Sequence, residues 1–82
     1  MRTPDEINFY YELLNREYQE SKDFRTLIKI RELAQFMRLS KVEKASKAEA
    51  RLANLNQLYT VDRDFRTRIK IQVWEYILRI ER

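Results

Sequence analysis

Six cations are the side chains of this chain whose type and spacing could bind an anion, and they form two matching groups. The members of a group are three and four residues apart: Lys22, Arg25 and Lys29, then Arg63, Arg66 and Lys70. This spacing places each group on one side of a helix. Cations in a first helical turn oppose the helix dipole, whereas a helix N-terminus with arginine suits a phosphate backbone or an acidic protein patch. The alternative is a solvated face whose arginines pair with acids such as Glu20 or Asp62.

The chain lacks several of the residue types that enzyme active sites use. It contains no histidine and no cysteine, so the usual general bases, nucleophiles and thiolate metal ligands are missing. It contains no glycine, which phosphate-binding loops and the nucleophile elbow require. The acid pairs Glu17 with Glu20 and Asp62 with Asp64 are typical of solvated surface. We therefore expect no enzyme activity, no catalytic residue, no cofactor and no metal site.

The two cationic groups belong to a longer repeat. The phrase Asp-Phe-Arg-Thr-x-Ile-Lys-Ile occurs at Asp23–Ile30 and again at Asp64–Ile71, an offset of 41 residues. Weaker matches extend the repeat to about residues 7–41 and 48–82. Repeats of about this length are usually one supersecondary unit each, so the chain is predicted to be one domain, 1–82, made of a duplicated helical hairpin. Within the phrase we expect the aspartate to cap a helix, the phenylalanine to plug the hairpin end and the first isoleucine to enter the core.

Apolar spacing and capping signals predict four helices. The predicted ranges are 4–20, 24–39, 41–59 and 64 to the C-terminus. Thr3 with Glu6 and Ser40 with Glu43 have the spacing of capping boxes. The expected fold is all-α, a small four-helix bundle, or three helices if the central two are continuous. The absence of glycine also speaks against turns that need positive φ.

The second and fourth predicted helices each carry two apolar faces. One face in each has the spacing expected for a core. The other face consists of Ile30, Leu33 and Met37 in the second helix and of Ile71, Trp74 and Leu78 in the fourth. A helix with apolar residues on opposite sides must be covered on both. These six residues are therefore either buried inside an irregular bundle or a protein-binding surface, with Trp74 as the best anchor.

Charge and hydropathy set the remaining expectations. The net charge is +4, a modest basic bias that permits an anionic partner. No apolar segment has the length of a membrane span, and a cytoplasmic location is expected.

The leading prediction is a small intracellular protein-interaction or regulatory module. It would act through the six apolar residues, as a homodimer or on a larger protein. The alternative is a nucleic-acid-binding protein that uses the six cations.

Overall fold

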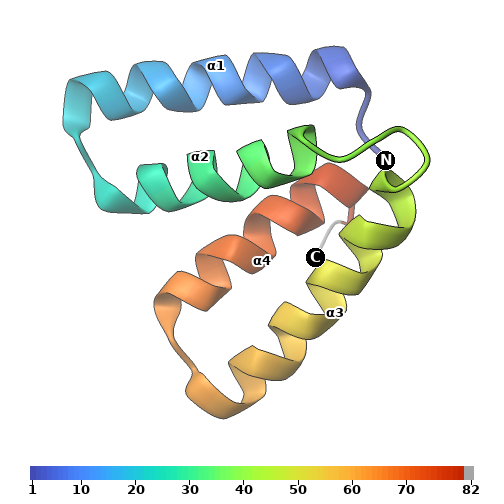
Figure 1. Cartoon of the computed structure of the whole chain (residues 1–82). Coiled ribbons are helices and arrows are strands. Elements are labelled where there is room, and N and C mark those ends of the chain that lie inside the picture. The colour runs from blue at the N-terminus through green and yellow to red at the C-terminus, as the bar shows by residue number, and fades with distance from the viewer. Residues whose placement is uncertain (81–82) are drawn as a thin grey trace.

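The computed structural model of the chain describes residues 1–80 and shows an all-α fold, with four helices in that range. They are α1 (Pro4–Ser21), α2 (Phe24–Met37), α3 (Lys44–Asp62) and α4 (Phe65–Leu78). α1 packs on α2 and α3 packs on α4, which gives two hairpins. Figure 1 shows α2 and α4 in the middle, with α1 and α3 outside them. Because the hairpins meet through α2 and α4, the predicted all-α four-helix bundle is confirmed.

The predicted caps begin three of these helices. At α1, the Thr3 side chain accepts from the backbone N–H of Glu6, and the Glu6 side chain accepts from the backbone N–H of Thr3, both at 3.2 Å. Asp23 caps α2 and Asp64 caps α4. A cap satisfies an N–H group that has no partner within its helix, so local sequence fixes where these three helices begin.

The ends of α1 and α3 differ from expectation. Lys22 and Arg63 have φ values of 55° and 50° and close these helices in the left-handed conformation that glycine usually takes. The backbone N–H of Lys22 donates to the carbonyl of Tyr18 at 2.8 Å, and that of Arg63 donates to Tyr59 at 3.0 Å. α3 consequently runs to Asp62, three residues beyond the predicted end. The expectation that a chain without glycine avoids positive φ was wrong here.

Helices α2 and α3 are separate, so the alternative of one continuous central rod is wrong. α2 ends at Met37 and α3 begins at Lys44, not at the predicted Lys41. Ser40 and Glu43 do bond to each other. The Glu43 backbone N–H donates to Ser40 Oγ at 3.3 Å, and Ser40 Oγ donates to Glu43 Oε1 at 2.9 Å. These bonds close a turn that precedes the helix.

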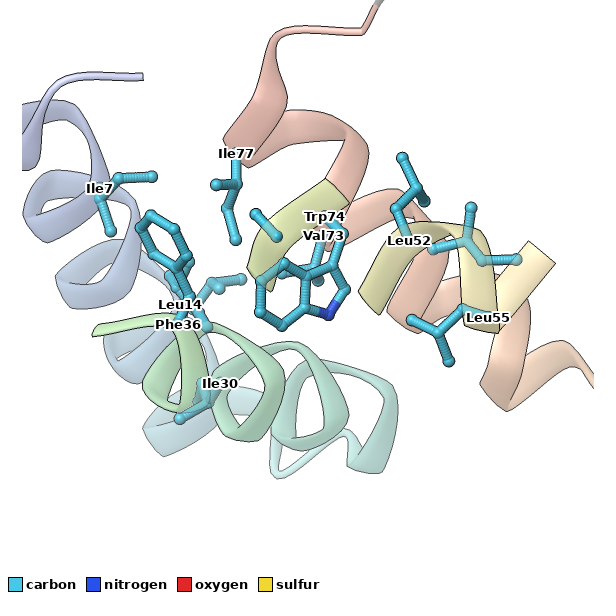
Figure 2. Packing of buried hydrophobic residues seen from close by; sticks show 12 residues of the cluster. Ile7, Leu14, Ile30, Phe36, Leu52, Leu55, Val73, Trp74 and Ile77 are labelled. Atoms are coloured by element: carbon cyan, nitrogen blue, oxygen red, sulfur yellow. The ribbon is translucent and has the colours of Figure 1, made fainter. Parts of the chain in front are cut away.

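The core joins residues of all four helices. Its largest fully buried side chains are Trp74, Phe36, Leu33, Ile77 and Val73. The rings of Phe36 and Trp74 meet edge to face with centroids 5.9 Å apart, a favoured aromatic geometry. In Figure 2 Trp74 lies between the side chains of the first hairpin and those of α3. The core therefore lies at the contact between the two hairpins.

Candidate anion-binding surface

Arg25 and Arg66 are held by the aspartates that cap their own helices. The backbone N–H of Arg25 donates to Asp23 Oδ1 at 2.9 Å, and Arg25 Nε lies 3.4 Å from the same oxygen. Arg66 repeats this arrangement, with its Nη2 donating to Asp64 Oδ2 at 3.0 Å. Both arginine side chains remain about three-fifths exposed. Each guanidinium is thus oriented by its neighbour while one side still faces solvent.

The same contacts keep the capping carboxylates ionised. The backbone N–H of Arg25, followed by its side chain, lowers the pKa of Asp23. For Asp64 the side chain of Arg66 is the largest cause of the lowered pKa, and the backbone N–H of Arg66 comes next. An aspartate is ionised at neutral pH even without these contacts, so both offset part of the positive charge there, and the lowered pKa keeps them ionised in more acidic solution.

The other four predicted cations have fewer partners. Within residues 1–80, none of Lys22, Lys29, Arg63 and Lys70 forms an ion pair, although Lys22 Nζ lies 5.2 Å from the centre of the Tyr18 ring. The expected alternative, in which arginines pair with Glu20 or with Asp62, is absent from this part of the chain. Asp62 instead accepts from the Thr67 hydroxyl at 3.0 Å.

The structure brings four of the six predicted cations into two grooves beside the α2–α4 contact, namely Arg25, Lys29, Arg66 and Lys70. Lys22 and Arg63 line neither groove. The larger groove is lined by Ile28, Arg31, Glu32, Gln35, Asp64, Arg66, Thr67 and Lys70. The other is lined by Asp23, Arg25, Thr26, Lys29, Ile69 and Gln72. Six of the residues of each groove correspond at the offset of 41. The main difference is that Arg31 in the larger groove is replaced by Gln72 in the other.

The grooves open on different sides of α2. Ile28, Arg31 and Gln35 line the first, whereas Arg25, Thr26 and Lys29 line the second. At about 100° per residue these two stripes point in clearly different directions. The cations therefore flank the α2–α4 contact on two sides.

Two phenylalanines lie between the starts of α2 and α4. Phe24 and Phe65 are the first residues of their helices, and their rings meet edge to face with centroids 5.8 Å apart. Each remains 52% exposed. The expectation that they plug the hairpin ends holds only in part, because about half of each side chain faces solvent next to the cations.

Four of the six residues predicted as a protein-binding surface lie inside the molecule, and the other two lie at the edge of its core. Ile30, Leu33, Ile71 and Trp74 are buried, with exposures of 8% or less, and Met37 and Leu78 are partly buried against the same core. Of the two alternatives drawn from the sequence, internal burial is the one that this chain adopts. The reason is geometric, because α2 and α4 are each covered on one side by their hairpin partner and on the other by each other.

Glu32 is the residue that sequence reasoning missed. Its side chain is 3% exposed, and Oε1 accepts from Trp74 Nε1 and from Arg51 Nη2, both at 3.0 Å. Gln35 Nε2 donates to Oε2 at 3.3 Å. The position that corresponds to Glu32 in the second half is Val73, and this replacement of an apolar residue by a carboxylate was the available signal.

Further features bear on the class of site. Among residues 1–80, no group of three or more acidic side chains is placed to hold a metal ion. None of the helices in the described range combines the length and the apolar character that crossing a membrane would need. Comparison with protein-family models, with curated proteins and with solved structures finds no match. Any functional conclusion must therefore be drawn from the chemistry of the surface.

Proposed function

We propose that this protein binds nucleic acid through the two cationic grooves beside the α2–α4 contact. The observation that carries the proposal is the local charge. Segments 22–31 and 63–70 contain eight basic residues and the two acids Asp23 and Asp64. Five of the eight basic residues line the grooves, together with these two aspartates and a third acid, Glu32. Both aspartates already act as helix caps. The net charge of these two segments is +6, against +4 for the whole chain, so positive charge is concentrated in the first halves of α2 and α4 and in the turns before them.

This surface suits a phosphate backbone. Arginines held by a neighbouring carboxylate, together with lysines that form no ion pair within residues 1–80, present donors at fixed and at adaptable positions. Phosphate contacts of this kind dominate the affinity of proteins for nucleic acid and need no sequence-reading element.

The protein-interaction and homodimer hypotheses have weaker support. They required an exposed apolar face on α2 and α4, and the six residues named for that face are buried or half-buried. A regulatory partner protein that binds elsewhere on the surface stays a prediction. Light scattering of the purified protein would reveal self-association and should accompany the binding experiment.

Charge reversal within the grooves tests the proposal. Lys29→Glu with Lys70→Glu should abolish most binding to a fluorescein-labelled oligonucleotide in an anisotropy titration at low salt. The wild-type affinity should fall steeply with salt, with a slope of roughly −0.7 to −0.9 for each phosphate contact. The double variant should show a smaller slope, because two cations near the backbone have been removed.

A matched control separates a site from net charge alone. Lys41→Glu with Lys47→Glu makes the same charge change at exposed positions outside both grooves. This control should keep an affinity within about threefold of the wild type. Equal losses in both double variants, or no binding by the wild type at low salt, would overturn the proposal.

A further inference from the structure

We infer that the ligand is a single-stranded nucleic acid, whose bases stack on Phe24 and Phe65 while its phosphates occupy the two grooves. The inference rests on the proposed function and specifies its ligand. Its first support is the exposure of these rings. The core aromatic residues Phe36 and Trp74 are buried to 2% exposure, whereas Phe24 and Phe65 keep about half of their surface in solvent. Neither belongs to the core cluster.

The second support is what surrounds the two rings. Phe24 lies in sequence between Lys22 and Arg25, and Phe65 lies between Arg63 and Arg66. Each ring is thus placed at the start of a cationic segment, and the two rings touch each other. Exposed aromatic side chains within a cationic surface are how proteins hold single strands, because every base has a face that can stack.

The third support is the position of the grooves. They open on different sides of α2, and the Phe24–Phe65 pair lies where the two helices start. A ligand that contacts both grooves must bend sharply around this end of a molecule only 33 × 31 × 23 Å in extent. Duplex DNA has a persistence length of about 50 nm and resists such a bend. A single strand can follow it.

The acidic residues of α1 also favour a single-stranded ligand over a duplex. α1 contains five acidic residues and one basic residue, and it packs along α2 beside the cationic surface. A wide duplex laid against the start of α2 would bring phosphates close to Glu17 and Glu20, which lie at the end of α1 next to that start. A narrow strand confined to the grooves and the two rings avoids them.

The test compares strands that differ only in their bases. A labelled oligothymidine of about twelve nucleotides, an abasic strand with the same phosphates and a duplex of the same length are titrated in parallel by anisotropy. The wild type should bind oligothymidine at least tenfold more tightly than the abasic strand, because stacking on each ring adds to affinity. The duplex should bind no more tightly than the abasic strand.

The double variant Phe24→Ala, Phe65→Ala should lose the preference for oligothymidine over the abasic strand. Its affinity for the abasic strand and the salt dependence of that affinity should not change. Phe9→Ala is the matched control, since Phe9 is 63% exposed on α1 and should have no effect. Phe24→Trp should keep the preference, and its fluorescence should be quenched by oligothymidine, which a merely structural role would not produce. Thermal melting of each variant checks that it is folded.

The outcomes distinguish the two proposals. Equal binding of oligothymidine and the abasic strand, or an unchanged preference in the Phe24→Ala, Phe65→Ala variant, overturns the single-strand inference and leaves the grooves as a general phosphate site. Failure of all three ligands to bind overturns the proposed function as well.

Discussion

Glu32 places a carboxylate among the apolar side chains that join the two hairpins. Its Oε1 accepts hydrogen bonds from Trp74 of α4 and from Arg51 of α3. One side chain of α2 is therefore bonded to both helices of the other hairpin. A buried donor that loses its acceptor costs about 1–3 kcal/mol. The Arg51 side chain is 36% exposed and can turn to water, but the indole N–H of Trp74 cannot.

Replacement of Glu32 should therefore destabilise the fold in a graded way. We expect Glu32→Ala to lower the free energy of unfolding by about 2–3 kcal/mol, because the Trp74 N–H is left without an acceptor. Glu32→Gln keeps an acceptor oxygen and should cost about 1 kcal/mol. Urea denaturation followed by Trp74 fluorescence measures both, with the exposed Glu49→Ala as control. Equal stability of Glu32→Ala and the control would contradict this role.

At the scale of the elements, the hairpin turns rest on two non-glycine residues in the left-handed conformation, Lys22 and Arg63. This conformation costs an ordinary residue about 1–2 kcal/mol. The left-handed residue occurs in both hairpins because it makes the turn short. The first helix ends one residue before it, and the aspartate one residue after it caps the next helix. At each turn the cost is balanced by a C-cap bond to a carbonyl of the preceding turn.

A glycine at such a turn should stabilise the protein. Arg63→Gly removes the steric cost but adds backbone entropy to the unfolded chain, so the expected net gain is up to about 1 kcal/mol. For a domain of this size, a gain of about 1 kcal/mol raises the melting temperature by roughly 4–8 °C. Gln57→Gly, at an exposed right-handed position of α3, should instead lose about 1 kcal/mol. Calorimetry that found the same sign for both variants would refute the argument.

At the scale of the whole molecule, the start of the chain is bonded to the end of α4. The backbone N–H of Arg2 donates to the Ile77 carbonyl at 2.8 Å, and Arg2 Nε donates to the Tyr76 carbonyl at 3.0 Å. Glu6 accepts from Arg79 Nη2 at 2.8 Å and from Arg2 Nη1 at 3.2 Å. These bonds connect the first helix to the last and supplement the apolar contact between the hairpins.

Acid should weaken this connection. The backbone N–H of Thr3, then Arg79 and Arg2, lower the pKa of Glu6 from its ordinary value of 4.5 to about 2. Because the folded pKa lies below the unfolded one, the contribution of Glu6 to stability is complete above about pH 4.5 and is lost as the pH falls towards 2. Glu6→Gln should flatten the pH dependence of the unfolding free energy in this window, whereas the exposed Glu12→Gln should not. A wild-type slope retained in Glu6→Gln would exclude the mechanism.

Local signals made much of this fold predictable. The Thr3–Glu6 box and the Asp23 and Asp64 caps begin their helices as expected, because a cap bonds to the backbone two or three residues away. The spacing of the six cations predicts one stripe on each helix, and the structure places four of them in grooves and leaves Lys22 and Arg63 outside. Local signals did not predict the left-handed ends at Lys22 and Arg63 or the extent of the turn around Ser40, because no glycine or proline marks these positions.

By itself the sequence determined the helical class, most helix starts and the recurrence of an aspartate, a phenylalanine and two cations at the start of α2 and of α4. Only the tertiary structure decided that the second apolar faces of α2 and α4 are largely internal and that Glu32 is buried. It also decided that four of the six cations line two grooves and that the rings of Phe24 and Phe65 meet where α2 and α4 start. The physical reason is that caps and helical periodicity act over one or two turns of a single helix. Burial and groove formation depend instead on how the two hairpins pack against each other, which no local pattern records.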